Sequence, residues 1–217
     1  MTSRIMHYAV AHRLTERIEI KEYNRFVLGA LAPDISSHDD GSYDVAHFWR
    51  KIESKGIKGI DWIKFYNKYR NEILDDDFLL GYYIHLIVDA YWFNTIQDKF
   101  IRKYPKDVKS ILYTKGYRDM YKYNSILIEK YSLVYNIESI SDIKIDEIDK
   151  SNVNQFLMDF KEDFKFEKDF NFKFELYPYD DIMLFLENVY QLCASEINAL
   201  KENQPQMNPE ELFVEIQ

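Results

Sequence analysis

The stretch from Gly81 to Phe93, "GYYIHLIVDAYWF", places one histidine and one aspartate in a run of bulky apolar residues. Such a run belongs inside a protein, where an ionised carboxylate is costly unless it is paired, hydrogen-bonded or bound to a metal. Residues four apart share one face of a helix, so His85 and Asp89 project side by side. The sequence therefore predicts a buried helix whose His/Asp pair needs partners, either as a structural hydrogen bond or as two ligands of one metal ion.

The length and composition of the chain limit the classes of protein to which it can belong. A chain of 217 residues can bury its own core, and we expect a single domain over 1–217. Cys193 is the only cysteine, which excludes an intramolecular disulfide or a thiolate metal cluster and favours a reducing, cytoplasmic location. The N-terminus is too polar for a signal peptide, and no apolar run reaches the roughly 18 to 20 residues of a transmembrane helix. The formal net charge of −9 argues against binding of extended nucleic acid, which depends on clustered Lys and Arg.

Hydrophobic periodicity predicts an all-α fold, a single-domain multi-helix bundle. Ser3 is the expected N-cap of the first helix, and Pro33 is expected to end the second. Helices are expected over about 3–18, 24–32, 45–52, 61–74, 78–100, 107–135, 153–170 and 179–202, with a possible break at Gly116. The helix over 78–100 is expected at the centre, with the first two helices packed against it. Residues 96–217 are expected to add further helices.

Three more polar residues are candidates for the partners of His85 and Asp89. His7 lies on the apolar face of the first helix, Asp34 follows the proline in "GALAPDI", and His47 precedes two aromatic residues in "HFW". Each alone fits a plain structural role: a core histidine, a helix-ending aspartate and a helix-start histidine. Taken together, they predict a metal site of imidazole and carboxylate ligands.

Two other histidines are expected to lie outside this site. His12 falls among charged residues on the polar side of the first helix, and His38 sits in a loop rich in Ser and Asp.

The segments "MHYAVAHRL", "FVLGALAPDI", "AHF" and "GYYIHLIVDAYW" resemble, in order and spacing, the zinc-dependent phospholipase C-like proteins of Gram-positive bacteria. The resemblance covers about residues 1–95 and extends distantly to phospholipase C and S1/P1-type nucleases. It implies a helical phospholipase C/P1 nuclease-like fold in which His7, Asp34, His47, His85 and Asp89 bind metal. It also implies hydrolysis of phosphoric esters by a metal-activated water.

One departure from those larger relatives limits the metal count. They complete a three-zinc cluster with histidines beyond the H-x-x-x-D helix, whereas this chain has no histidine after His85. We therefore expect one or two ions rather than three. Zinc is the first choice, although imidazole and carboxylate ligands also accept Fe or Mn.

The resulting hypothesis is a metal-dependent hydrolase acting on a small phosphoester or a phospholipid-like substrate. Asp34 is the candidate for both metal ligand and general base. One alternative is a non-catalytic metal-binding or structural helical protein. A second is an HD-type phosphohydrolase, which requires an adjacent His-Asp dipeptide; the only one here, His38-Asp39, falls in the predicted loop.

Overall fold

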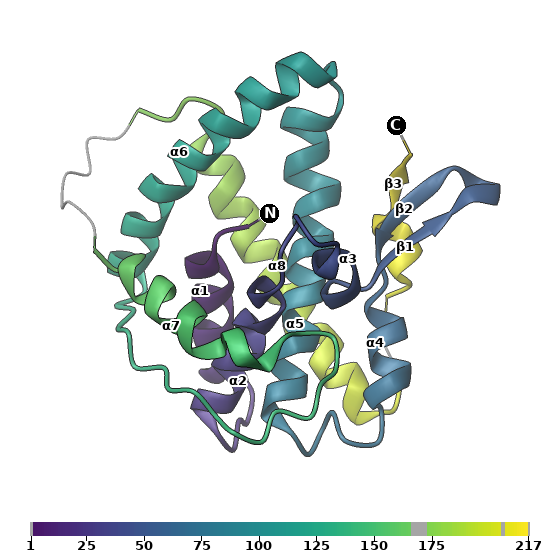
Figure 1. Cartoon of the computed structure of the whole chain (residues 1–217), viewed down its shortest axis with the longest axis vertical. Helices are drawn as coiled ribbons and strands as arrows, with labels where there is room; N and C mark the ends of the chain where they lie inside the picture. Colours follow the sequence, from purple (N-terminus) through teal and green to yellow (C-terminus); the bar gives the residue numbers. More distant parts are fainter. Residues whose placement is uncertain (1, 166–172, 205–206, 217) are drawn as a thin grey trace.

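A computed structural model describes residues 2–165, 173–204 and 207–216 of the chain (Figure 1). Helices dominate these residues, as predicted, and a small antiparallel sheet in the order β1-β2-β3 accompanies them. The helices are α1 (Arg4–Thr15), α2 (Tyr23–Leu31), α3 (Ser42–Ala46), α4 (Trp62–Tyr69), α5 (Asp77–Trp92), α6 (Lys106–Lys130), α7 (Val153–Glu162) and α8 (Tyr179–Lys201). The strands are β1 (Trp49–Ile52), β2 (Ile57–Ile60) and β3 (Val214–Glu215).

Helix α5 lies at the centre of the fold, as expected from its sequence (Figure 1). Every residue of α5 except Tyr91 is buried, and α2 packs on it more extensively than any other element does. Two glycines permit this packing. A Cβ on Gly29 would lie 2.0 Å from the carbonyl oxygen of Phe78, and one on Gly81 would lie 2.0 Å from that of Phe26. The two helix backbones are therefore in direct contact, at a distance that no larger residue allows.

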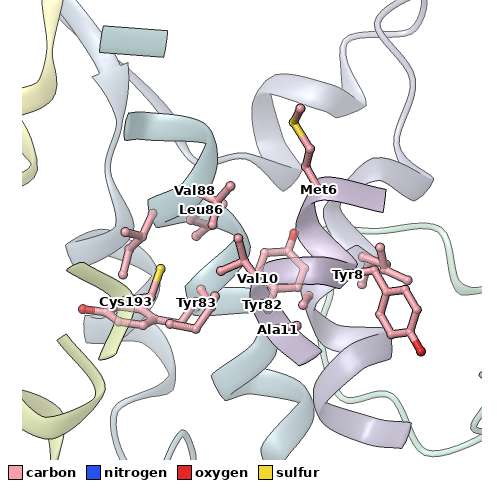
Figure 2. Close-up of a cluster of buried hydrophobic side chains, with 14 of the residues drawn as sticks. Met6, Tyr8, Val10, Ala11, Tyr82, Tyr83, Leu86, Val88 and Cys193 are labelled. Atoms are coloured by element: carbon pink, nitrogen blue, oxygen red, sulfur yellow. The ribbon is translucent and has the colours of Figure 1, made fainter. Parts of the chain in front are cut away.

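Helix α1 begins as predicted. The Ser3 hydroxyl accepts a hydrogen bond from the amide of Met6 at 3.2 Å and caps the first turn. Figure 2 shows side chains of α1, among them Met6 and Val10, in one buried cluster with Tyr83 of α5 and Cys193. The first helix thus joins α5 in the same core as α8.

The prediction of a helix over 45–52 is wrong. Helix α3 covers Ser42–Ala46 and ends just after the residue at which the predicted helix was to begin, and Phe48 adopts a φ of 51°, in the left-handed region. A helix cannot pass through that conformation, so the chain turns and continues as β1. Phe48 is held by an edge-to-face contact with Phe65 of α4, with ring centroids 5.4 Å apart. The fold is mostly helical with one small sheet, which is compatible with the expected all-α class.

The other predicted helices are present with shifted ends. α4 ends at Tyr69 rather than near 74, and the α-helical part of 78–100 ends at Trp92, after which a π-helix, η3, runs over Phe93–Arg102. α6 passes Gly116 without a break. α7 ends at Glu162, and the part of its predicted range beyond residue 165 lies outside the described residues.

Within the described ranges, none of the helices has the length and apolar character needed to cross a bilayer.

Replacing Gly81 by Ala tests the contact between α2 and α5. The added methyl would collide with the Phe26 carbonyl, so we expect the free energy of unfolding to fall by about 2–3 kcal/mol although Ala is the better helix former. Gly56→Ala is the matched control: its Cβ meets no atom within 4 Å, and its positive φ costs only about 1 kcal/mol. Urea denaturation compares the two. A Gly81→Ala protein no less stable than Gly56→Ala would contradict this account.

Candidate metal centre

Four of the five predicted ligands come together in the structure. Asp34, His47, His85 and Asp89 each offer a ligand atom, and these atoms all lie within 4.8 Å of one another. The Nε2 atoms of His47 and His85 are 3.1 Å apart. Asp89 Oδ2 lies 3.5 Å from His47 Nε2 and 3.7 Å from His85 Nε2, and Asp34 Oδ1 lies 3.7 and 3.9 Å from the same two atoms. Ligands about 2.0 Å from a tetrahedral zinc ion lie about 3.3 Å from one another, so the four donors need only a small inward shift.

The hydrogen bonds of the two histidines orient both rings toward this centre. His85 Nδ1 lies 2.9 Å from the carbonyl oxygen of Ala30, and His47 Nδ1 lies 3.0 Å from that of Tyr43. A carbonyl only accepts, so each Nδ1 carries a proton, and in the neutral form of each ring Nε2 then presents a lone pair. Two lone pairs facing each other at 3.1 Å cannot bond one another, whereas a cation between them satisfies both.

The charges also suit a cation. Burial, and next the nearby His7, lower the pKa of His85 to about 3, so its imidazole is neutral at pH 7. Burial works against ionisation of Asp34 and Asp89, but the surrounding histidines outweigh it and lower both carboxyl pKa values, that of Asp89 well below its ordinary range. Neutral imidazoles and ionised carboxylates are the protonation states in which these groups bind metal.

Each ligand is positioned by a recognisable local feature. Asp34 lies in a short 3-10 helix, η1 (Ala32–Ile35), which continues from α2. His47 caps the C-terminus of α3, where the Tyr82 hydroxyl donates to the Ala46 carbonyl at 2.6 Å. His85 and Asp89 lie one turn apart on α5.

His7, the fifth predicted ligand, lies on the other side of Asp89. Its ring stacks on that of His85 with centroids 3.7 Å apart, and its Nε2 is 3.3 Å from Asp89 Oδ1. The Thr2 hydroxyl lies between the two, donating to Asp89 Oδ1 at 2.6 Å with its oxygen 2.5 Å from His7 Nε2. Asp89 therefore joins two groups: Oδ2 faces the four-donor cluster, and Oδ1 faces His7 and Thr2. The expected position of His7 and Asp34 near His85 is confirmed.

Sequence reasoning missed Thr2 and Tyr43. The Tyr43 hydroxyl donates to Asp89 Oδ2 at 3.4 Å, and its ring stacks on His47 with centroids 3.7 Å apart. Thr2 precedes the first helix and Tyr43 follows a polar loop, so neither shows a periodicity that points to a buried site.

The two histidines expected outside the site are not among the four grouped donors. His12 Nδ1 lies 3.0 Å from the hydroxyl of Tyr23. His38 stacks on the Tyr43 ring, also at 3.7 Å, and lies in the walls of the cavities next to the cluster. It is therefore closer to the centre than its loop composition indicated.

Two cavities border the cluster. The smaller, of about 270 Å³, is lined by Asp34, and the larger, of about 400 Å³, by Asp89. They share walls formed by His38, Tyr43 and Tyr117. A small molecule could thus approach the donors from either side.

A scan against protein-family models and searches of curated proteins and of solved structures each returned no match.

Metal content tests the centre directly. We expect one or two zinc ions per chain, and His85→Gln should lose at least one of them because its Nε2 faces the other three donors. Removing metal with a chelator should lower the melting temperature, since free metal at a hundred times its Kd contributes about 2.7 kcal/mol. Elemental analysis and thermal denaturation measure both effects.

His12→Gln is the matched control. His12 also lies in α1, and its ring nitrogen Nδ1 contacts the Tyr23 hydroxyl instead of a donor of the cluster. It should keep the metal content of the unaltered protein. Equal metal content in the two variants, or three tightly bound ions, would show that the site has been placed wrongly.

Proposed function

We propose that this chain is a metal-dependent hydrolase of phosphoric esters, with zinc as the metal. The proposal rests mainly on one observation: a cluster of two imidazoles and two carboxylates opens onto a cavity through a carboxylate. The Asp34 side chain is 11% exposed, compared with 4% for Asp89 and 0% for His47 and His85. A merely structural metal site is more often closed on all sides.

Asp34, His47, His85 and Asp89 would hold the cation. Bound there, the cation would supply Lewis-acid polarisation of a phosphoryl oxygen and lower the pKa of a coordinated water toward ~7. Iron and manganese suit the same donors.

The remaining roles belong to residues of the chain. Asp34 lines the smaller cavity and is ionised, so it can accept a proton from the attacking water as general base. Tyr43 and Thr2 donate to the two oxygens of Asp89 and fix the carboxylate in place. His7 stacks on His85 and limits its rotation. A second ion, if bound, would be held by His7 together with Asp89.

The motif resemblance over residues 1–95 supports this reading and leads us to propose a phospholipase C/P1 nuclease-like arrangement of the helices. A small phosphoester or a phospholipid-like molecule is the proposed substrate. The sole cysteine, Cys193, is free and buried, which agrees with the proposed cytoplasmic location of a bacterial protein.

Two alternatives predict different results. A non-catalytic metal protein would bind the ion and turn over no ester. An HD-type phosphohydrolase would use the His38-Asp39 dipeptide, but neither residue belongs to the four-donor cluster. The position of that dipeptide favours the first proposal.

Turnover of bis(4-nitrophenyl) phosphate tests the activity. We expect hydrolysis that depends on added zinc and is abolished by a chelator. Asp34→Asn should lower kcat by about a hundredfold or more, the usual contribution of a general base. Metal content measured on the same sample separates loss of the base from loss of a ligand.

His12→Gln again serves as the control and should keep full activity. A metal-loaded protein that hydrolyses neither this diester nor other phosphoesters would favour the non-catalytic alternative.

A further inference from the structure

Several cations lie close to residues that line the larger cavity. On the β1–β2 hairpin, Trp49 pairs with Ile60, and both line this cavity. Side chains alternate along a strand, so the next pair on the same face is Lys51 with Lys58. The hairpin therefore carries an aromatic and aliphatic pair that lines the cavity, and two lysines form the next pair on the same face of the hairpin.

The π-helix η3 also carries residues that line the cavity and a cation close to them. Phe93 and Gln97 line the cavity, and Phe93 makes an edge-to-face contact with Trp49 at 4.8 Å. The Arg102 guanidinium lies over the Phe93 ring at 5.1 Å and donates to the carbonyl oxygen of Glu215. Arg102 is therefore held beside β3, the strand that pairs with β2.

Helix α6 likewise carries a residue that lines the cavity and a lysine one turn away. Tyr113 lines the cavity and accepts a hydrogen bond from Gln97 at 2.8 Å. Lys109 lies four residues earlier, one turn away on the same face of α6. Three separate elements thus carry a cation next to a residue that lines the cavity: one strand pair on from Trp49 and Ile60, over the Phe93 ring, and one helical turn from Tyr113.

Lys58 lies close to other cations. Burial, followed by the charges of Arg102 and Lys51, lowers the pKa of Lys58; Asp44 opposes them, and Lys109 adds a smaller lowering effect. Asp98 does pair with Arg102, at 2.9 Å, and Glu215 adds a further carboxylate near Arg102. Among the described residues, however, neither Lys51 nor Lys58 makes an ion pair. Like charges placed opposite each other in a sheet are destabilising, and this pair occurs in a chain of net charge −9.

We propose that the Lys51 and Lys58 pair, with Arg102 beside it, binds the anionic end of an elongated ligand whose apolar or aromatic middle fills the larger cavity. The anion would be a phosphate, sulfate or carboxylate, since each satisfies clustered ammonium and guanidinium groups. At about 1.5 Å per residue, the helical path from Asp89 to Arg102 spans about 15 to 20 Å. This second subsite does not require catalysis. If the proposed hydrolysis also holds, the substrate is a phosphoester that carries another anionic group at this distance from the reacting phosphorus.

Calorimetric titration with two probes of similar shape tests the subsite. Naphthalenesulfonate offers a flat ring and an anion, and naphthyl methyl sulfone offers the same ring without charge. We expect the sulfonate to bind about tenfold more tightly than the sulfone at low salt, and this preference should shrink as sodium chloride screens the cations.

Two variants locate the binding. Lys58→Glu should abolish the preference for the sulfonate and leave sulfone affinity unchanged, with metal content as before. Ile60→Trp, which fills the cavity, should weaken both probes. Lys144→Glu, a charge reversal at an exposed lysine away from this hairpin, is the matched control and should change neither affinity.

Equal affinities of the two probes for the unaltered protein would overturn the proposal, as would a sulfonate preference that survives Lys58→Glu. These outcomes are independent of turnover. The hydrolase proposal can fail while the anion subsite is supported, and the anion subsite can fail while the hydrolase proposal is supported.

Discussion

The backbone contact between α2 and α5 is the constraint on which the rest of the structure depends. Because Gly29 and Gly81 bring the two helices together, the carbonyl of Ala30 reaches His85 Nδ1 on the neighbouring helix. That single hydrogen bond sets the tautomer of His85 and turns its Nε2 toward the cluster. The same contact places η1, and with it Asp34, over the face of α5 that carries Asp89. The close packing of α2 on α5, which involves no donor side chain, thus determines the geometry of the donors.

The donor cluster is an electrostatic arrangement that is incomplete without a positive charge. Two carboxylates with lowered pKa values lie beside the neutral His85 imidazole in a largely buried region, and this arrangement is costly for the protein alone. Burial and the nearby His7 lower the pKa of His85, so this imidazole does not supply the missing positive charge at pH 7. A divalent ion bound to the Nε2 atoms would supply it and leave the Nδ1 hydrogen bonds to the backbone carbonyls in place. Folding and metal binding are therefore expected to be strongly coupled.

The elements that the sequence revealed are those with local signals. The buried run around His85 and Asp89, the cap at Ser3 and the proline after α2 all act within a few residues, and each predicted an element that the structure contains. Asp34 and His47 could also be identified, because each is a polar residue next to apolar residues in the sequence. The third strand could not be predicted in the same way, because Val214–Glu215 pairs with β2, more than 150 residues away in the chain. Thr2 and Tyr43 were missed for a related reason: they meet Asp89 only through tertiary packing.

The left-handed backbone at Phe48 extends the sensitivity of the site to residues that touch no ligand. A non-glycine residue in this conformation is strained by about 1 kcal/mol or more, and glycine would relieve the strain. The phenyl ring is nevertheless held by Phe65, which stacks in turn on Tyr82 at 4.9 Å, and Tyr82 bonds the carbonyl just before His47. The aromatic side chains therefore keep the backbone in a conformation it would otherwise leave, and they fix the direction of His47. Tolerance to mutation should accordingly be low in this aromatic layer, where sequence drift would change metal affinity while leaving all four donors in the chain.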